Sequence, residues 1–251
     1  MSNSLRKALN LLFIVSDNAG SEGLAIKELA HLSGLTPSTV HRFLQVFKEY
    51  DLIEQNESTQ NYGLGSQLLF LGLKVKGMLD IRKVALPVLK ELSNETKEDS
   101  CLAVAKGDQG VHIERVEGPY PTKAIETYGT QIPLHCGAAR RVLLSFKDDE
   151  WIKGYIQRGL KSYTENTIIE PEKLLNEIEK IRKEGYAVSR SEYIEYACGV
   201  FAPVRDYTGE VLASIGIICL NMRFTPDRVQ ELIGKTKTAS KKLSKKLGYI
   251  D

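Results

Sequence analysis

The stretch GLTPSTVHRFLQVFKEYDLIEQNESTQNYGLG, residues 34–65, decides the fold of the N-terminal part of the chain. Thr36 followed by Pro37 marks a helix start, because threonine can accept a hydrogen bond from a free backbone N–H and proline suits the first helical position. We expect this helix to run to about Tyr50. Its apolar residues fall on one side, at positions 40, 43, 44 and 47. The helix is therefore predicted to bury one face and to leave a polar face free.

Two further helices are predicted before this one. Apolar residues between Leu5 and Ser16 follow the i, i+3, i+4 spacing of an amphipathic helix. A second, short helix is expected to end at Gly34, where a left-handed backbone costs little. After the third helix, segments 52–55 and 61–64 flank a polar turn and read as a small hairpin. This order is typical of a winged helix-turn-helix, a DNA-binding unit.

The polar face of the third helix carries side chains suited to reading DNA. Arginine can pair with guanine and glutamine with adenine through two hydrogen bonds, and hydroxyls can serve phosphates or base edges. We expect this helix to enter the major groove, while the first helix and the hairpin turn at 56–61 contact the backbone or the minor groove. The candidate DNA-binding residues are Ser38, Thr39, His41, Arg42, Gln45, Arg6 and Lys7.

Charge is spread unevenly along the chain, whose formal net charge is +2. Residues 1–65 hold five Lys or Arg against seven Asp or Glu, whereas the last 22 residues hold six Lys against two acidic residues. Phosphate neutralisation usually supplies much of the affinity for DNA, so the acidic N-terminal part predicts a shallow salt dependence of binding. The C-terminal lysines are interpreted as the solvated face of a helix.

Composition excludes several classes of protein. With 251 residues, 42% of them hydrophobic and 26% charged, the chain is predicted to be globular, with two domains. No stretch approaches about 18 consecutive apolar residues, and the N-terminus lacks the features of a signal peptide. We therefore expect a cytoplasmic protein without membrane contact. The sequence has no phosphate-binding glycine fingerprint, H-E-x-x-H or G-x-S-x-G motif, so no enzyme and no cofactor are predicted.

The rest of the chain is predicted to form an α+β domain. Residues 66–80 are apolar on more than one side, which predicts a linker helix packed against another subunit, with burial inside its own chain as the alternative. Pro87 is expected to begin a new helix or to bend the helix predicted at 81–98. The mixed order of elements favours an antiparallel sheet with helices on one side. Strands are expected at 100–105, 111–116, 122–128, 186–189, 199–205 and 211–219, and helices at 135–146, 148–157, 172–184 and after Thr225-Pro226.

The segments SLRKALNLL, IKELAHLSGLTPSTVHRFLQVFKEYDLIE and YGLGSQLLFLG, within residues 4–72, resemble the DNA-binding domain of the IclR-type transcriptional regulators. Further pieces, PLHCGAARRVLLSF, EIEKIRKEGYAVSRSE and GVFAPVRDYTGEVLASIGI, are similar to the effector domain of that family, so the resemblance covers nearly the whole chain. It implies a winged helix-turn-helix at 1–65, a linker helix at 66–80, and a GAF-like or PAS-like effector-binding and oligomerisation domain at 81–251.

The resemblance also implies a function. Such a protein is most often a repressor that acts as a homodimer or dimer of dimers on a palindromic operator of double-stranded DNA. A small-molecule effector in the C-terminal domain changes its affinity for the operator. The alternative is a metabolite, metal or redox sensor that acts through protein partners, which the acidic N-terminal part slightly favours.

An effector pocket is expected where segment 134–139 passes from a loop into a helix, because free N–H groups and the helix dipole favour a carboxylate there. By the resemblance, this segment borders the cavity. Family members that bind small carboxylates often carry an acidic residue in place of Ser189, a cysteine in place of Gly199, and serines in place of Gly216 and Ile218. This chain is therefore expected to take a different, bulkier or more apolar ligand, among carboxylates, aromatics or sugar-derived metabolites. The candidate effector-binding residues are Leu134, His135, Cys136, Gly137, Ala138, Ser189, Cys198, Gly199, Gly216, Ile218, Cys101 and Cys219.

The four cysteines admit other interpretations. Together with His112 and His135 they could supply zinc ligands, but no local spacing of these residues supports a zinc site, and no metal site is predicted. Redox sensing is a further option. The favoured interpretation is that the cysteines are free thiols that pack as small buried apolar residues.

Overall fold

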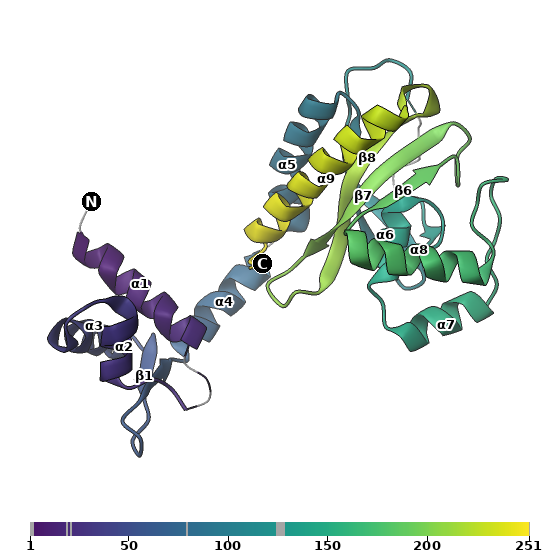
Figure 1. The fold of residues 1–251 in the computed structure, drawn as a ribbon. Helices are drawn as coiled ribbons and strands as arrows, with labels where there is room; N and C mark the ends of the chain where they lie inside the picture. The colour runs from purple at the N-terminus through teal and green to yellow at the C-terminus, as the bar shows by residue number, and fades with distance from the viewer. Residues whose placement is uncertain (1–2, 19, 21, 79, 124–128, 251) are drawn as a thin grey trace. The chain divides into compact units, whose positions relative to one another are not determined.

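The computed structural model describes residues 3–18, 20, 22–78, 80–123 and 129–250, with the backbone alone at 73–78. The chain divides into two compact units, within residues 1–79 and 80–251 (Figure 1). Helix α4 (Gln67–Met78), expected as a linker, falls within the first unit. The three-part division at 1–65, 66–80 and 81–251 stays a prediction.

The first unit is a winged helix-turn-helix, as predicted. It consists of α1 (Asn3–Asn18), α2 (Ile26–Ser33), α3 (Pro37–Glu49) and an antiparallel hairpin of β1 (Ile53–Gln55) and β2 (Tyr62–Leu64). Gly34 ends α2 with a φ of 66°, and the Thr36 hydroxyl accepts a hydrogen bond from the backbone N–H of Thr39, 3.4 Å away. The predicted apolar stripe of α3 is buried, and it packs on the other helices and the hairpin through Leu11, Val15, Leu29, Ile53 and Tyr62.

The second unit is built on one antiparallel sheet of six strands in the order β5-β4-β3-β8-β7-β6. Its elements are α5 (Ile81–Thr96), β3 (Asp99–Lys106), β4 (Gln109–Val116), β5 (Ile132–Pro133), α6 (Ala138–Ser145), α7 (Asp149–Gln157), α8 (Pro171–Glu184), β6 (Ala187–Arg190), β7 (Ala197–Arg205), β8 (Val211–Leu220), a 3-10 turn (Asn221–Arg223) and α9 (Pro226–Lys246).

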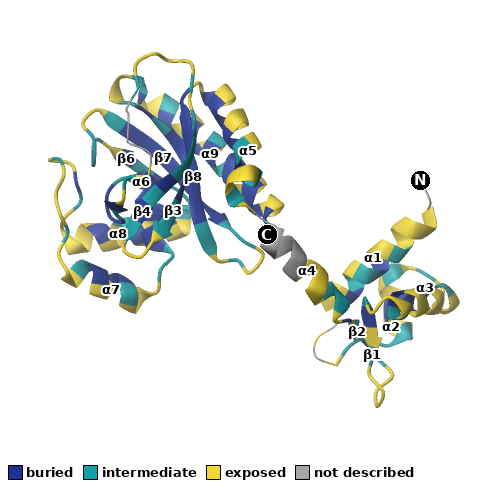
Figure 2. Ribbon diagram, turned by 180° about the vertical axis from the view of Figure 1, so that it is seen from behind, coloured by how far each residue is buried: buried dark blue, intermediate teal, exposed yellow. Residues whose placement is uncertain are grey.

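The expectation of helices on one side of this sheet is wrong, because helices cover both faces. One core cluster joins α5 and α9 to the sheet, and a second joins α6, α7 and α8 to it. Figure 2 shows the central strands buried along most of their length. The reason lies in the sequence of β7 and β8, which are near-continuous apolar runs and so bury both faces.

Three other expectations need correction or completion. Helix α5 continues through Pro87 rather than restarting there, because its buried face packs on α9 and the sheet and outweighs the hydrogen bond lost at proline. Helix α6 begins at Ala138 instead of residue 135, because Gly137 has a φ of 77° and the chain before it forms a turn. The strand expected at 122–128 lies mostly outside the described residues. Strand β5, only two residues long, was not predicted.

Candidate DNA-binding surface and effector cavity

Helix α3 separates its two faces as DNA recognition requires. Ser38, His41, Arg42 and Gln45 are exposed and Thr39 is half-buried, while the opposite stripe is buried. The guanidinium of Arg42 lies 5.6 Å from the ring centre of its neighbour Phe43. Since that stripe anchors the helix in the core, its polar side chains are held on a rigid element.

Local hydrogen bonds organise these side chains. The His41 Nε2 and Gln45 Nε2 atoms lie 3.3 Å apart, one turn of helix from each other. At the start of α3 the hydroxyls of Thr36 and Thr39 are 2.9 Å apart. Such contacts within one helix can be exchanged for contacts to a base or a phosphate at little cost.

The hairpin turn at 56–61 is polar and uncharged except for Glu57. The Asn56 side chain accepts hydrogen bonds from the backbone N–H groups of Ser58, at 2.9 Å, and Thr59, at 3.1 Å. Asn61 donates to the backbone carbonyl of Glu22, 3.0 Å away, which ties the hairpin to the chain before α2. The turn is thus a defined polar projection without basic residues.

Helix α1 exposes both basic and apolar side chains. Arg6 and Lys7 are exposed near its start. Leu5, Leu9 and Phe13, at i, i+4 and i+8, expose 62%, 45% and 64% of their surface. An apolar stripe left uncovered on a helix usually meets a partner.

The second unit holds a small cavity of about 50 Å³ between the sheet, the start of α6 and the loop that follows β6. Six predicted effector-binding residues line it, namely Gly137, Ala138, Ser189, Cys198, Gly199 and Ile218. Its other lining residues include His112, Arg140, Glu192, Tyr193 and Phe201.

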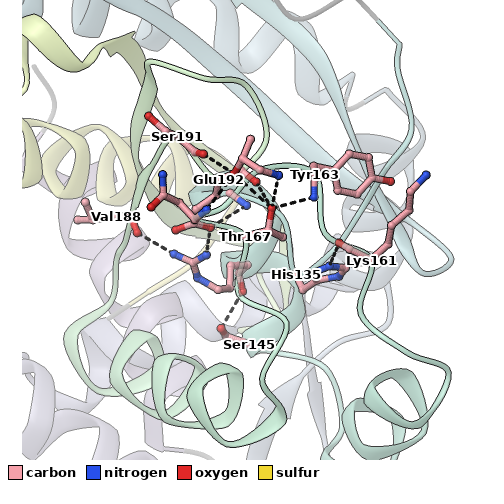
Figure 3. Close-up of polar contacts among 12 residues, drawn as sticks. His135, Ser145, Lys161, Tyr163, Thr167, Val188, Ser191 and Glu192 are labelled. Carbon is pink, nitrogen blue, oxygen red and sulfur yellow. Dashed lines mark hydrogen bonds and ion pairs between the residues drawn. The ribbon is translucent and has the colours of Figure 1, made fainter.

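Glu192 occupies the anion position at the start of α6. Its carboxylate accepts a hydrogen bond from the backbone N–H of Gly137, 3.1 Å away, and pairs with the guanidinium of Arg141. Arg141 is 1% exposed and also donates to the carbonyl of Val188, at 2.7 Å. Thr167 donates to the backbone carbonyl of Glu192, at 2.7 Å. Figure 3 shows how these contacts converge on Glu192. The chain therefore places its own carboxylate where the sequence suggests that of a ligand.

His135 and Cys136 lie outside this cavity. His135 Nδ1 lies 2.7 Å from the Tyr155 hydroxyl, and its Nε2 lies 3.0 Å from the carbonyl oxygen of Lys161. Burial lowers the pKa of His135 and raises that of the Cys136 thiol to about 12. The imidazole therefore fixes the loop, and the protonated thiol is neither a nucleophile nor an anion.

Four other candidate residues, Leu134, Cys101, Cys219 and Gly216, also lie outside the cavity. Leu134 and Cys101 are buried in the cluster with α6, α7 and α8. The Cys219 side chain belongs to the opposite cluster, with α5 and α9, and so does that of Cys198, although Cys198 borders the cavity. Gly216 is covered by Phe201, whose ring carbon Cγ lies 2.6 Å from where a Cβ on Gly216 would stand. Alternation of side chains along each strand explains the split, because neighbouring residues face opposite sides of the sheet.

Four polar residues of the cavity lining, His112, Arg140, Glu192 and Tyr193, were not predicted as effector-binding residues from the sequence. Burial, with the charges of Arg140 and Arg115, lowers the pKa of His112 to about 3, so its imidazole is neutral. Arg140 is 3% exposed and lies 5.5 Å from the ring centre of Tyr193. A signal was present, because two adjacent arginines interrupt the apolar run AARRVLLS of α6, every residue of which is buried.

All four cysteines are buried, and none of them forms a disulfide bond. Among the described residues, no group of three or more His, Cys, Asp or Glu side chains lies close enough to hold a metal ion. No helix in the part of the chain that the structure describes is long and apolar enough to cross a membrane.

Comparison with protein families matches both units. The model of the IclR helix-turn-helix domain matches residues 4–57, and that of the bacterial transcriptional regulator IclR C-terminal domain matches residues 74–245. The chain is 34% identical over 250 residues to the HTH-type transcriptional regulator KipR of Bacillus subtilis, an alignment that covers 99% of this chain and 100% of KipR. It is 30% identical over 250 residues to the regulator KdgR of Escherichia coli, covering 99% and 95% of the two chains.

Solved structures agree with this assignment. The Thermotoga maritima IclR structure superposes with a TM-score of 0.65 at 29% identity, over 98% of this chain and 99% of that one. The Agobacterium tumefaciens repressor BlcR superposes with a TM-score of 0.86 over 99% and 98% of the chains, and its 23% identity speaks for the fold alone. The protein is thus a DNA-binding transcriptional regulator with a C-terminal effector domain, not an enzyme, and it belongs to the IclR family.

Proposed function

We propose that this regulator is a cytoplasmic repressor that binds a palindromic operator as a homodimer or a dimer of dimers, and that a small metabolite changes its affinity for that operator. The observation that carries the proposal is the division of α3 into a buried stripe and an exposed polar face. Two-fold symmetry of a dimer would match the two half-sites of a palindrome.

Base readout is assigned to the exposed face of α3. Arg42 and Gln45 lie three residues apart on this face. Arg42 can form two hydrogen bonds with a guanine, and Gln45 can form two with an adenine. Ser38, Thr39 and His41 then contact phosphates or neighbouring base edges. Arg6 and Lys7, exposed on α1, serve the DNA backbone.

Dimer formation is supported by apolar surface on the first unit. Besides the stripe of α1, helix α4 exposes Leu69, Phe70 and Leu71 to 64%, 59% and 46%. Monomeric proteins rarely leave contiguous apolar patches of this kind open to water. The proposal is that a second copy of the chain packs against both helices. For α4 this is the contact with another subunit that the sequence predicts.

The effector is assigned to the cavity beside α6. The cavity volume of about 50 Å³ has room for only a very small molecule. A ligand of ordinary metabolite size would need a larger cavity. Phe201, packed against Gly216, and the loop at 191–196 are the parts that would move. Within this loop Ser191 and Tyr196 have φ values of 50° and 64°, an unusual backbone for residues with side chains.

The chemistry of the lining favours an organic anion with an apolar part. Arg140 supplies positive charge beside neutral His112, and Phe201 and Ile218 supply apolar walls. A carboxylate on the ligand could also compete with Glu192 for Gly137 and Arg141. Displacing Glu192 would release the loop at 191–196, and a ligand can shift operator affinity only by favouring one such arrangement over another.

A gel-shift assay on the region upstream of the protein's own gene tests the proposal. We expect a discrete complex, footprinted as two half-sites, and a metabolite panel screened by thermal shift should yield an anion that both raises the melting temperature and changes the gel shift. Absence of any preference for genomic fragments over mixed-sequence DNA would contradict the proposal. A ligand that stabilises the protein but leaves its operator affinity unchanged would contradict the proposal that a metabolite controls operator binding.

A further inference from the structure

The second unit also contains a basic groove of about 910 Å³. It lies among the C-terminal half of α9, the end of α8 and the end of β7. Seven Lys or Arg side chains and one acidic side chain, Glu184, line it. Such an imbalance favours an anionic partner.

Helix α9 contributes a row of lysines to this groove. Lys237, Lys241 and Lys245 are spaced four residues apart, so they share one face of the helix and extend over about 12 Å. Lys241 and Lys245 are exposed, and Lys237 donates to the carbonyl of Glu184, 2.9 Å away. The sequence suggested only a solvated helix face, but the structure brings cations from other elements opposite this row.

Those cations come from segments far apart in the chain. Arg182 and Lys183 lie at the end of α8, and Arg205 lies at the end of β7. Arg205 donates to the carbonyl of Gly209, at 2.7 Å, and its guanidinium lies 4.8 Å from the ring centre of Phe146. A carbonyl and an aromatic ring orient this guanidinium without cancelling its charge. Arg182, by contrast, pairs with Asp149 at 2.8 Å.

The groove lies at the end of the second unit where the chain enters it. Helices α5 and α9 run side by side in opposite directions, since Lys235 reaches the carbonyl of Glu95 and Lys242 pairs with Glu91 (Figure 1). The C-terminal end of α9 therefore lies by the start of α5, at residue 81. The basic row thus occupies the part of α9 that is nearer to the start of α5.

We propose that this groove binds the phosphate backbone of duplex DNA without reading its sequence. Sites for small molecules bury most of the ligand, whereas this groove presents exposed ammonium groups, an arrangement suited to a polymer. DNA is the polyanion that the chain already binds through its first unit. That unit carries more acidic than basic residues over 1–65, so its own attraction for phosphates is weak.

The proposal predicts a specific salt dependence. Each lysine that neutralises a phosphate releases condensed counterions, and its removal lowers the slope of log K against log salt by about one. Removing the row on α9 should therefore reduce the magnitude of the slope by about three for each protomer that contacts the DNA. Because the contacts are to phosphates, the preference for operator over mixed-sequence DNA should not change.

The test uses the full-length chain and two labelled duplexes, one of mixed sequence and one from the region upstream of its gene, titrated by fluorescence anisotropy over a series of salt concentrations. The variant is Lys237→Gln/Lys241→Gln/Lys245→Gln. The matched control, Lys90→Gln/Lys153→Gln/Lys180→Gln, removes the same charge from exposed positions of α5, α7 and α8 outside the groove.

The proposal is supported if the magnitude of the slope falls by about three per bound protomer for the groove variant on both duplexes, while the control is unchanged. Equal slopes and affinities for the groove variant and the control would overturn the proposal. An effect confined to the binding of polyglutamate or tripolyphosphate would also overturn it, because it would indicate that the groove binds an acidic protein or a phosphorylated ligand. Should the triple variant fail to fold, Lys241→Gln/Lys245→Gln, at two exposed positions, should reduce the magnitude of the slope by about two per bound protomer. The preference of the wild-type chain for the upstream duplex over the mixed-sequence duplex is measured in the same titrations. A wild-type chain without this preference would contradict the proposed operator binding, and this outcome is distinct from a failure of the groove proposal.

Discussion

The carboxylate of Glu192 lies 3.1 Å from the backbone nitrogen of Gly137, at the start of α6. Free N–H groups at a helix start attract an anion, and here the anion comes from the chain itself, 55 residues further along. The same carboxylate pairs with buried Arg141. The loop that follows β6 is therefore fastened to α6 by a buried ion pair, at the edge of the proposed effector cavity.

Replacing Glu192 by alanine should destabilise the second unit. The change leaves the Arg141 guanidinium buried without its counter-charge, which typically costs about 3–5 kcal/mol of unfolding free energy. Urea unfolding followed by circular dichroism measures the difference. Glu195→Ala, at an exposed position three residues on, is the control and should change stability little. Similar stabilities for the two variants would show that the ion pair does not fasten the loop.

Two glycine substitutions should have opposite effects. A Cβ at Gly216 would stand 2.0 Å from the carbonyl oxygen of Val200 and 2.6 Å from the Phe201 ring, so Gly216→Ala should destabilise by about 1–3 kcal/mol or more. Gly154 lies within α7 with open space around its Cβ position, so Gly154→Ala should stabilise by about 0.5–1 kcal/mol. Thermal unfolding of both variants checks the signs. A stable Gly216→Ala variant would mean that β7 and Phe201 can shift.

The free energy of unfolding should decrease as the pH falls, in part because of His112. Its pKa is about 3 in the folded chain and 6.5 in the unfolded chain, so protons bind the unfolded state first. The contribution is complete above pH 6.5 and is lost as the pH falls toward about 3, by about 1.4 kcal/mol per pH unit. In His112→Gln, the loss of unfolding free energy between pH 7 and pH 5 should be about 2 kcal/mol smaller than in the wild type.

The control for this pH dependence is His31→Gln, which changes an exposed imidazole and should keep the wild-type pH profile. Burial also lowers the pKa of His135, so part of the acid sensitivity should survive in His112→Gln. Parallel profiles for wild type and His112→Gln would show that His112 does not stay neutral in the folded chain.

The fold was largely readable from the sequence where local signals decide it. Thr36-Pro37 and Gly34 fixed the ends of α3 and α2 through capping chemistry. Apolar runs bounded by turn residues located most strands of the second unit, and patterns of period 3.6 located most of its helices. The placement of helices on both faces of the sheet was missed, although the unbroken apolar runs of β7 and β8 indicated it.

The proposed effector site was less predictable because it depends on contacts between distant segments. No local pattern announces that Glu192 will reach Gly137, or that Phe201 will cover Gly216. Strand alternation could have separated Cys219 from Ile218, since neighbours on a strand face opposite sides. The position of Arg140 beside His112 required the sheet register as well as the sequence.

Phe13→Glu should weaken self-association of the chain. Phe13 is 64% exposed on α1, so the substitution should spare the fold while placing a charge in the proposed dimer surface. Sedimentation equilibrium should show a lower association constant, and operator binding should weaken with it. Ile169→Glu, an exposed apolar position of the second unit, is the control. If Phe13→Glu associates like the wild type, the stripe of α1 does not form the interface.

The most direct test of the central claim, that the polar face of α3 reads DNA, is the operator affinity of Arg42→Ala compared with Lys153→Ala, each measured against mixed-sequence DNA at fixed salt. We predict that Arg42→Ala loses about 1–3 kcal/mol of operator affinity and most of its preference at one base position of each half-site, while Lys153→Ala behaves as wild type. A folded Arg42→Ala protein, and likewise a folded Gln45→Ala protein, that binds the operator as tightly and as selectively as the wild type would contradict the claim.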